Sequence, residues 1–457
     1  MQIILLSGGS GKRLWPLSND TRSKQFLQLL QTPAGRPESM VQRVVRQISE
    51  SEITDNITVA TSESQKDFIA TQLGQKVTTV TEPSRRDTFP AIVLSSAYLA
   101  MEKGCKRDEV IVVMPCDTYT DSEYFEIVHS MSSLVEHGVA NLVLMGIAPT
   151  VPSTKFGYVV ASPANENGVF YNVERFIEKP DKINAQLLFN RGAFWNGGVF
   201  AFKLGYMMDI ISSYIQVESF AELHDRYDEL PKISFDYEIV EKAKSVALVP
   251  FSGKWEDLGS WNTLIEELPH TTLGNVVKGD STSGTTIINE LSIPIVCEGT
   301  TDLIVAASYD GILICDRKAS ELIKKYTGPI DARPMYEERR WGSYAVLNNA
   351  VYSDGYRSLT KELTIKAGRF ISYQVHHHRN EVWTFVDGEG MLVIDGVTTK
   401  VTRGSVVNIM KEQKHAVKAI TDLRFIEVQA GDKLTEDDID RFDWDWEKAV
   451  QQLEQSK

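Results

Sequence analysis

The chain has 457 residues, of which 42% are hydrophobic and 24% are charged. One hydrophobic core rarely supports this length, so two or three domains are expected, and the apolar content excludes a largely disordered chain. With 48 basic against 62 acidic side chains, the net charge of -14 excludes a general nucleic-acid-binding protein. The same charge would repel an anionic substrate unless the binding site carries a local positive charge.

Four widely spaced cysteines form no CxxC pair: Cys105, Cys116, Cys297 and Cys315. Their spacing predicts neither a zinc ribbon nor a disulfide framework, and reduced thiols are expected. The apolar run at residues 1–6 is too short for a signal-peptide core. No stretch approaches the roughly 18 apolar residues of a membrane helix. We therefore expect a cytoplasmic protein that binds neither membrane nor nucleic acid.

Residues 1–265 alternate short apolar runs with helical stretches, which predicts an α/β layered domain. Continuous β-branched runs of this kind are typical of parallel strands that are buried on both faces. The predicted strands are Ile3–Leu6, Ile57–Ala60, Val110–Val113 and Leu142–Met145, and the predicted helices span 38–49, 62–73 and 90–102.

The pattern changes twice after residue 265. Residues 266–330 hold short runs separated by Gly and Asp without a useful helical period, which predicts a small β-rich connecting module. Residues 331–457 contain many short strands with turn signals, which predicts a small all-β barrel or sandwich. The last 26 residues carry nine acidic and four basic side chains. We expect them to form an exposed acidic helix or tail without a function of its own.

The first predicted strand ends in the glycine-rich loop SGGSGKRLWPLS, residues 7–18. Glycines at such a turn let backbone N–H groups approach a phosphate. The loop is not a dinucleotide-binding fingerprint, because Leu14 stands at the third glycine position. It is not a Walker A loop either, because Leu6 and Arg13 stand where Gly and Ser or Thr are required. Residues 1–37 carry five basic side chains against one acid, a local charge of +4. A tight turn with solvated basic residues is the alternative that this loop alone leaves open.

At its full length the loop, followed by Lys24, resembles the signature of sugar-1-phosphate nucleotidylyltransferases, and more narrowly that of mannose-1-phosphate guanylyltransferases. Further motifs of that family follow in its order: PSRRDTFPA at 83–91, MPCD at 114–117, Gly157-Tyr158, FIEKP at 176–180, WNGG at 195–198 and WEDLGSW at 255–261. Asp87 departs from the family, which commonly has Asn there. The resemblance implies a doubly wound, mostly parallel sheet over 1–265. It also implies the formation of GDP-mannose and pyrophosphate from GTP and mannose 1-phosphate.

This reaction is an in-line attack of one anion on another, so the protein has to position phosphates and neutralise charge. Arg13 and Lys24 are expected to stabilise charge on the leaving pyrophosphate, and Asp117 with Asp257 to hold Mg²⁺. The alternative for each aspartate is a helix cap or a turn residue. The candidate nucleotide-binding residues are Gly8, Gly9, Ser10, Gly11, Lys12, Arg85, Thr88 and Pro90.

The resemblance also assigns an acceptor site. It gives Lys179 to the sugar phosphate and Glu178 with Asn196 to the sugar hydroxyls. Gly157 and Gly198 complete that candidate set. A surface turn after a strand is the alternative for the Glu178-Lys179-Pro180 segment. A polar pocket of this type discriminates between epimers, because a wrong epimer leaves buried groups without partners.

A second set of motifs lies in residues 331–457. The spacing of Gly368, Gln374, His376, Glu381 and Gly388 matches the first cupin motif, with Gln374 replacing its first histidine. Gly404 and His415 match the frame of the second motif, although Met410, Glu412 and Ala419 replace its usual Pro, Gly and Asn. With Arg340–Tyr344 and the segment 426–431, residues 331–442 resemble the isomerase domain of type II phosphomannose isomerases, which is often fused to the guanylyltransferase.

This second resemblance implies that Gln374, His376, Glu381 and His415 bind a divalent metal such as Zn²⁺. The metal would polarise the carbonyl of mannose or fructose 6-phosphate while a base, which we do not identify, moves a proton between C1 and C2. We expect His377 and His378 to lie in a solvated turn. A metal-free cupin that serves oligomerisation is the alternative, and departures from the family at Arg340, Val382 and Met410 leave it open.

Three functional hypotheses follow. The first is an enzyme that makes GDP-mannose, with or without the isomerase activity. The second is the same catalyst with another base or sugar and a non-catalytic cupin domain. The third is a catalytically dead regulator that binds a sugar nucleotide, and the intact pair Asp117 and Asp257 speaks against it. The family resemblance further suggests a homodimer.

Overall fold

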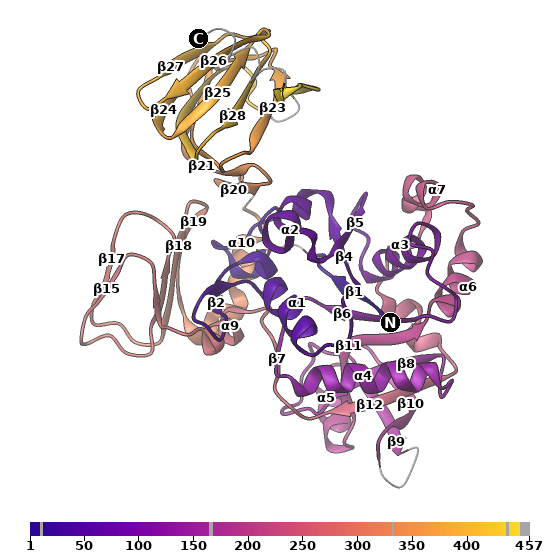
Figure 1. Ribbon diagram of the computed structural model, residues 1–457. Helices are drawn as coiled ribbons and strands as arrows, with labels where there is room; N and C mark the ends of the chain where they lie inside the picture. The colour runs from indigo at the N-terminus through magenta and orange to yellow at the C-terminus, as the bar shows by residue number, and fades with distance from the viewer. Residues whose placement is uncertain (10–11, 164–167, 331–332, 436–437, 448–457) are drawn as a thin grey trace.

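The computed structural model describes residues 1–9, 12–163, 168–330, 333–435 and 438–447 (Figure 1). Within this part of the chain, nine strands form the central sheet of the first region, in the order β5-β4-β1-β6-β11-β8-β12-β10-β9. Only β10 and β11 run against the other seven, so the predicted mostly parallel sheet is confirmed. The strands are β1 (Gln2–Leu6), β4 (Ile57–Ser62), β5 (Thr78–Glu82), β6 (Val110–Pro115), β8 (Leu142–Ile147), β9 (Tyr158–Pro163), β10 (Tyr171–Ile177), β11 (Phe194–Lys203) and β12 (Val246–Phe251).

Helices cover both faces of this sheet. Side chains alternate along a strand, so Ile3 and Leu5 of β1 face one side and Ile4 faces the other. The first core contains α1 (Met40–Glu50), α2 (Lys66–Leu73) and α4 (Glu123–Glu136); the second contains α3 (Thr88–Met101), α6 (Leu204–Tyr214) and α7 (Phe220–Asp225). The predicted strands and the three predicted helices of this region are present, and the sheet is doubly wound.

The second region consists of short strands in two small sheets, with the strand order β14-β16-β18-β19 in one and β15-β17 in the other. The parallel pairings show that the chain coils, and each turn adds a strand to the stack. The bounds are β14 (Thr272–Leu273), β15 (Val276–Lys278), β16 (Thr286–Asn289), β17 (Ile295–Cys297), β18 (Leu303–Ser308) and β19 (Gly311–Asp316). The region also contains a 3-10 helix, Arg317–Leu322, and α10 (Ile323–Thr327), which the sequence pattern did not indicate.

The coiled module supports the segment that follows the glycine loop. Its Ile288 and Ile304 share one core with Leu14, Leu17 and Trp261, the last from α9 (Trp261–Glu267). The catalytic candidates Arg13 and Lys24 therefore stand on a segment that is packed from both sides.

The third region is all β, as predicted. One antiparallel sheet contains β20 (Tyr336–Arg339), β21 (Gly342–Val351), β22 (Arg357–Ile365), β29 (Leu423–Gly431), β24 (Arg379–Asp387) and β27 (Val406–Ile409). The other contains β26 (Val397–Thr402), β25 (Glu389–Ile394), β28 (His415–Ala419), β23 (Phe370–Val375) and β30 (Asp440–Phe442). Trp383, Phe385 and Phe425 pack with Leu392 and Val417 between the sheets, which gives a cupin-like barrel.

The expectation of an exposed acidic tail holds for Asp440, Asp443, Asp445 and Glu447, but it is wrong for Asp438 and for the anchoring of the segment to the barrel. Asp438 is 3% exposed, β30 pairs with β23, and the buried Trp446 packs beside Tyr373. The charge count overlooked the apolar anchors Trp444 and Trp446, whose burial ties this acidic segment to the barrel. Residues 448–457 of the expected tail lie outside the described part of the chain.

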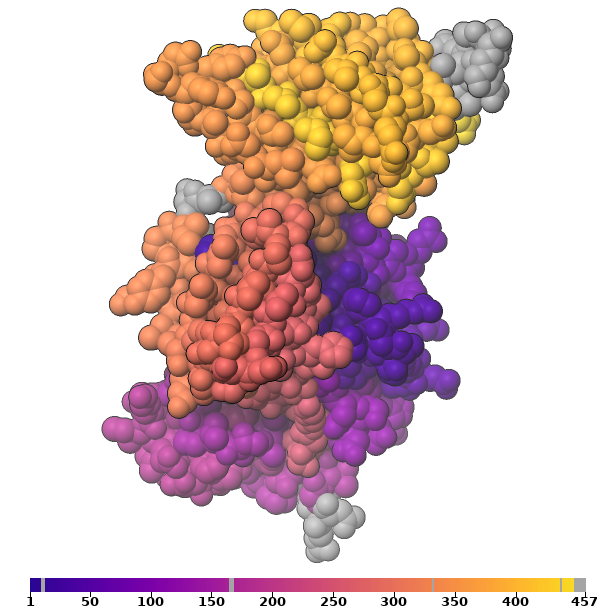
Figure 2. All heavy atoms as spheres, turned by 90° about the vertical axis from the view of Figure 1, so that its left-hand side faces the viewer, coloured from indigo at the N-terminus to yellow at the C-terminus, as the bar shows by residue number. Residues whose placement is uncertain are grey.

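The cupin region meets the rest of the molecule through β20 and the turn after it (Figures 1 and 2). Arg340 Nε lies 2.7 Å from Asp67 Oδ1 on α2. The ring of Tyr336 stacks on Tyr309 of the module and lies 5.3 Å from the guanidinium carbon of Arg22. Arg22 also makes two hydrogen bonds to Glu290, at 2.8 and 3.0 Å. All three regions therefore meet two residues away from Lys24.

Candidate functional site

Lys24 lies between the two aspartates that were predicted to hold a metal. Its Nζ is 2.7 Å from Asp117 Oδ2 and 3.2 Å from Asp257 Oδ1. Asp117 follows β6, and Asp257 ends β13 (Trp255–Asp257), which pairs with β7 (Thr118–Thr120) so that Asp257 lies opposite Thr118. This strand pairing explains why two residues 140 positions apart share one lysine.

The charges of this cluster stabilise one another. Burial alone would lower the pKa of Lys24, but Asp117 and then Asp257 outweigh it and raise the pKa. Burial would raise the pKa of Asp257, but Lys24 and then Arg13 lower it. The cluster is thus a lysine cation between two carboxylates, with one negative charge in excess. That excess and the carboxylate oxygens suit a hard divalent cation.

A buried network of amides positions the glycine loop and Lys24, and sequence reasoning missed it. Gln65 is fully buried, and its Nε2 donates to Ser23 Oγ at 2.6 Å and to the carbonyl of Gly9 at 3.4 Å. Gln25 Nε2 donates to the carbonyl of Ser7 at 3.0 Å. Both glutamines lie outside any periodic apolar pattern that would have marked them. Together they tie the beginning of the loop, at Ser7 and Gly9, to the residues beside Lys24.

A cavity of about 210 Å³ opens at this cluster. Its lining includes the predicted Gly8, Thr88, Asp117 and Gly198 together with the unpredicted Gln25 and Asp236. Gly9 has φ +131°, a conformation that favours glycine.

The other predicted nucleotide-binding residues lie away from the lining. Arg13 is exposed but near enough to Asp257 to lower its pKa. Arg85 Nη2 donates to the carbonyl of Asp20 at 2.9 Å on the surface, and Pro90 is buried in the first turn of α3. Ser10 and Gly11, and the side chain of Lys12, lie outside the described residues.

The predicted acceptor residues come together at the other side of the cavity. Glu178 forms an ion pair with Lys179, and Asn196 N donates to the carbonyl of Gly157 at 2.8 Å. A Cβ at Gly157 would collide with Glu178 Oε2, so only glycine leaves room for that carboxylate. Gly198 N donates to Asn196 Oδ1 at 3.2 Å. The five candidates therefore form one polar cluster, of which Gly198 lines the cavity.

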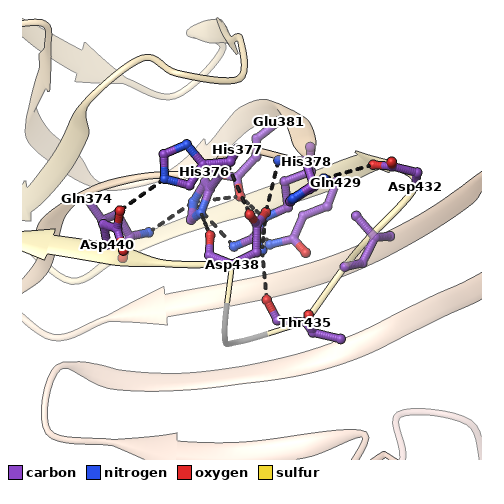
Figure 3. Close-up of polar contacts among 12 residues, drawn as sticks. Gln374, His376, His377, His378, Glu381, Gln429, Asp432, Thr435, Asp438 and Asp440 are labelled. Atoms are coloured by element: carbon purple, nitrogen blue, oxygen red, sulfur yellow. Dashed lines mark hydrogen bonds and ion pairs between the residues drawn. The ribbon is translucent and has the colours of Figure 1, made fainter.

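The cupin region carries a buried cluster of His376, Glu381 and His415, of which Figure 3 labels His376 and Glu381. Their ligand atoms all lie within 4.8 Å of one another. Nε2 of His376 is 3.2 Å from Glu381 Oε1, and Nε2 of His415 is 3.6 Å from Glu381 Oε2. His376 follows β23 and His415 begins β28, which pairs with β23, while Glu381 lies on β24 of the other sheet, so the barrel brings the three residues together from two sheets.

The two imidazoles are oriented as metal ligands usually are. Nδ1 of His376 lies 3.1 Å from the carbonyl of Asp438, and Nδ1 of His415 lies 3.0 Å from that of Gln413. A proton on each Nδ1 leaves the Nε2 lone pair directed at Glu381. Nε2 of His415 is buried and has no hydrogen-bond partner among the described residues. This buried acceptor without a donor fits a bound cation.

Donors from the protein surround Glu381 as well. It accepts from Arg379 Nε and Trp383 Nε1 at 3.0 Å and from Gln429 Nε2 at 3.2 Å. Burial lowers the pKa of His376 to about 4. Burial would raise the pKa of Glu381, but His376, His415 and Arg379 lower it. A neutral His376 imidazole beside an ionised Glu381 carboxylate has the protonation states that metal ligation requires.

Gln374 lies beside this cluster in a different orientation from the one predicted. Its Nε2, not its amide oxygen, is the atom 3.4 Å from His376 Nε2. A role as metal ligand therefore requires the amide to turn over. The structure thus brings the four predicted metal ligands together. Three of them, His376, Glu381 and His415, already have their ligand atoms within 4.8 Å of one another.

Asp438 and Arg379 are the residues of this site that sequence reasoning missed. Asp438 accepts from the backbone N–H groups of His377 and His378, at 3.1 and 3.3 Å, and its Oδ2 lies 3.6 Å from Arg379 Nη1 (Figure 3). Asp438 thereby fixes the turn between His376 and Glu381. The side chains of His377 and His378 are 41% and 48% exposed, as the predicted solvated turn requires.

A cavity of about 540 Å³ reaches this cluster through Gln374 and Glu381. Its lining is rich in basic side chains: Arg339, Arg340, Lys361, Arg369, Arg379 and Arg441. Asp67 of α2 closes one side of it. A cavity with this lining suits an anionic ligand.

Two family models match the chain. "Nucleotidyl transferase" matches residues 2–273, and "Mannose-6-phosphate isomerase C-terminal" matches residues 333–444. The mannose-1-phosphate guanylyltransferase of Escherichia coli K12 is 31% identical, over 96% of this chain and 97% of its own length. The xanthan biosynthesis protein XanB of Xanthomonas campestris is also 31% identical, over 96% and 97%. A solved structure from Thermus thermophilus, named as a mannose-1-phosphate geranyltransferase, is 28% identical with a TM-score of 0.59 and covers 72% of this chain and 99% of its own.

Proposed function

The chain belongs to the mannose-1-phosphate guanylyltransferase family, and we propose that it forms GDP-mannose and pyrophosphate from GTP and mannose 1-phosphate. One observation carries this proposal: Lys24 stands between Asp117 and Asp257 at a cavity with nucleotide and acceptor candidates on its two sides. A site that only binds a sugar nucleotide has no need of this charge arrangement.

The residues would divide the work as follows. Backbone N–H groups of the glycine loop donate to the triphosphate of GTP. Lys24 and Arg13 offset the charge that develops on the leaving pyrophosphate. Asp117 and Asp257 would hold Mg²⁺, which supplies further positive charge to the phosphates when bound.

On the acceptor side, Lys179 neutralises the phosphate of mannose 1-phosphate, while Glu178 and Asn196 accept or donate at its hydroxyls. Anchoring both anions aligns the attacking phosphate oxygen with the α-phosphorus.

The test is pyrophosphate release from each of several nucleoside triphosphates paired with mannose, glucose and galactose 1-phosphates. We expect the highest kcat/KM with GTP and mannose 1-phosphate. Release with another pair but not with this one would favour a relative of different specificity. No release with any pair from folded protein would favour the non-catalytic regulator.

A second function is favoured by the unpartnered Nε2 of His415. We propose that His376, Glu381 and His415 hold a divalent metal, with Zn²⁺ the expected ion, and that the basic cavity above them accepts mannose or fructose 6-phosphate for isomerisation. Metal content and isomerase activity of chelator-treated and reloaded protein test this. Activity that persists in a His376→Ala, His415→Ala double variant would refute it.

We further propose that the protein works as a homodimer in a reducing compartment, the cytoplasm. All four cysteines are free thiols, as such a compartment favours. Among the described residues, no helix combines the length and apolarity needed to cross a bilayer. Light scattering during size-exclusion chromatography tests the dimer, and a mass of one chain would contradict it.

A further inference from the structure

Asp236, which no motif marked, lies at the boundary between the two halves of the transferase cavity. It belongs to α8 (Phe235–Glu238) and lines the cavity together with Thr88, Asp117 and Gly198. The backbone around it is held firmly, because Phe235 N donates to Thr88 Oγ1 at 2.8 Å and Phe89 N donates to the carbonyl of Ile233 at 3.2 Å. Its carboxylate is therefore positioned by the fold rather than free to rotate into solvent.

The contacts of Asp236 join it to the acceptor residues. Its Oδ1 accepts from Asn196 Nδ2 at 2.5 Å. Asn196 in turn accepts from Gly198 N and donates its own N–H to the carbonyl of Gly157. The Asn196 amide is thus oriented from both ends. Each carboxylate oxygen has two lone pairs, so Asp236 retains acceptor capacity toward the cavity.

The charge around Asp236 indicates which ligand groups it can bind. Burial, and then the neighbouring Glu178, raises the pKa of Asp236 to about 6. Two carboxylates that face one pocket repel a phosphate and are stabilised by neutral O–H donors. A hexose presents several such hydroxyls in a fixed stereochemical order.

We infer that Asp236 is a specificity-determining residue for the acceptor sugar, whose carboxylate accepts from a hydroxyl group of the hexose 1-phosphate and distinguishes mannose from its epimers. The inference rests on the proposed transferase function. An epimer that turns this hydroxyl away leaves a buried carboxylate and the Asn196 amide without their ligand partner, and such mismatches produce large discrimination. The ribose of the nucleotide is the competing source of hydroxyls, since Thr88 is close. The direct bond to Asn196 favours the hexose.

The test compares Asp236→Asn and Asp236→Glu with wild type, and uses Asp225→Asn as the matched control because that side chain is 85% exposed. Values of kcat/KM are measured for mannose, glucose and galactose 1-phosphates at saturating GTP. KM values for GTP and 2′-deoxy-GTP are measured at saturating mannose 1-phosphate. We expect both Asp236 variants to lose about tenfold or more in the preference for mannose over glucose, while the KM for GTP stays within about twofold.

Three outcomes would overturn the inference: an unchanged sugar preference, an equal loss for all three sugars, or a raised KM for GTP with lost discrimination against 2′-deoxy-GTP. The last would assign Asp236 to the ribose. The charge-preserving Asp236→Glu and thermal unfolding of both variants separate a sugar contact from a folding defect. If the wild-type enzyme does not turn over GTP with mannose 1-phosphate, the proposed function is wrong, and this result is distinct from a failure of the inference. Asp236 is then tested by the ratio of kcat/KM values for the three sugar phosphates with the nucleotide that wild type does use.

Discussion

The transferase cluster and the cupin cluster both place acidic side chains beside a basic one, but they differ in exposure. Asp117 and Asp257 are 28% and 38% exposed, with Lys24 at 15%. Glu381 and His415 are 1% and 0% exposed, with Arg379 at 4%. Water can satisfy the first cluster whenever substrates leave. A buried imidazole nitrogen without a partner costs about 1–3 kcal/mol, so the second cluster is built for a ligand that stays.

The two clusters also differ in how the chain assembles them. The transferase cluster gathers residues 24, 117 and 257 from segments that meet only after the sheet and the coiled module have packed. The cupin cluster uses residues on or next to three strands of one barrel and a single distant group, Asp438. We therefore expect substitutions in the first to affect turnover and substitutions in the second to affect metal retention and stability.

The largest effect should come from Asp117→Asn and Asp257→Asn. Each removes a charge that cannot be replaced in a site that handles several phosphate charges, so we expect kcat to fall by about 10²-fold or more. Pyrophosphate release at saturating substrates measures this. Asp209→Asn is the matched control, because Asp209 is 73% exposed and far along the chain. If both site variants keep half or more of the wild-type activity, Asp117 and Asp257 have no essential role in the mechanism.

The next effect concerns metal loss from the cupin cluster. A tightly bound cation stabilises the fold by about 4 kcal/mol when its concentration is 1,000 times its Kd. We expect Zn²⁺ to raise the Tm of chelator-treated wild type and to leave that of His415→Ala unchanged. His378→Ala, outside the cluster, serves as control and should respond like wild type. An equal rise in Tm for His415→Ala would show that the cation binds elsewhere.

A buried carboxylate in the transferase region, Glu82, sharpens the comparison further, because burial outweighs the hydrogen bond from Tyr227 and the charge of Arg85. Burial raises the pKa of Glu82 from 4.5 to about 7, opposite to the shift of Glu381. The folded state therefore holds its proton more tightly than the unfolded state, so wild type loses stability as pH rises from about 4.5 to 7. Glu82→Gln should remove this loss of unfolding free energy, which amounts to at most about 3 kcal/mol at pH 8.

Denaturant unfolding of wild type and Glu82→Gln at pH 5 and pH 8 measures this difference. We expect the two proteins to differ more at pH 8, with the variant the more stable. Glu63→Gln, whose side chain is 70% exposed, is the control and should show no such pH dependence. If the difference in unfolding free energy between wild type and Glu82→Gln is smaller at pH 8 than at pH 5, the raised pKa of Glu82 is contradicted.

The smallest effect on stability is expected at the contact between the cupin domain and the transferase domain. Arg340 is 63% exposed, so its ion pair with Asp67 should contribute about 1 kcal/mol or less. A double-mutant cycle with Arg340→Ala and Asp67→Ala measures the coupling. A coupling well above that value would show that the domain contact is stiffer than an exposed ion pair.

Much of this architecture follows from local sequence signals. Continuous β-branched runs such as Val110–Val113 marked buried strands, and the turn signals at Asp387-Gly388 and Asp395-Gly396 marked the barrel. The motif-bearing residues Lys24, Asp117 and Asp257 converge as their chemistry requires. These features depend on periodicity or on glycine and charge at fixed spacing, which a sequence displays directly.

The residues that were missed depend on contacts between distant segments. Asp236 and Gln65 matter because of the side chains that folding brings to them, and nothing in their neighbours along the chain reveals this. Asp438 stands among acidic residues whose charge suggested solvent, while its partners are the backbone of residues 377–378 and the side chain of Arg379, about 60 positions earlier. A charge count along the chain cannot distinguish a buried carboxylate from a solvated one.

The start of α2 contacts both the glycine loop and the cupin cavity. Gln65, immediately before the helix, bonds the glycine loop, and Asp67, in its first turn, bonds Arg340 at the cupin cavity. Helical residues two positions apart are separated by only about 3 Å along the axis. A displacement of this helix would therefore move both a residue that bonds the glycine loop and a residue that lines the cupin cavity. Any influence that a ligand in one cavity has on affinity in the other must, by thermodynamic reciprocity, be matched in the opposite direction.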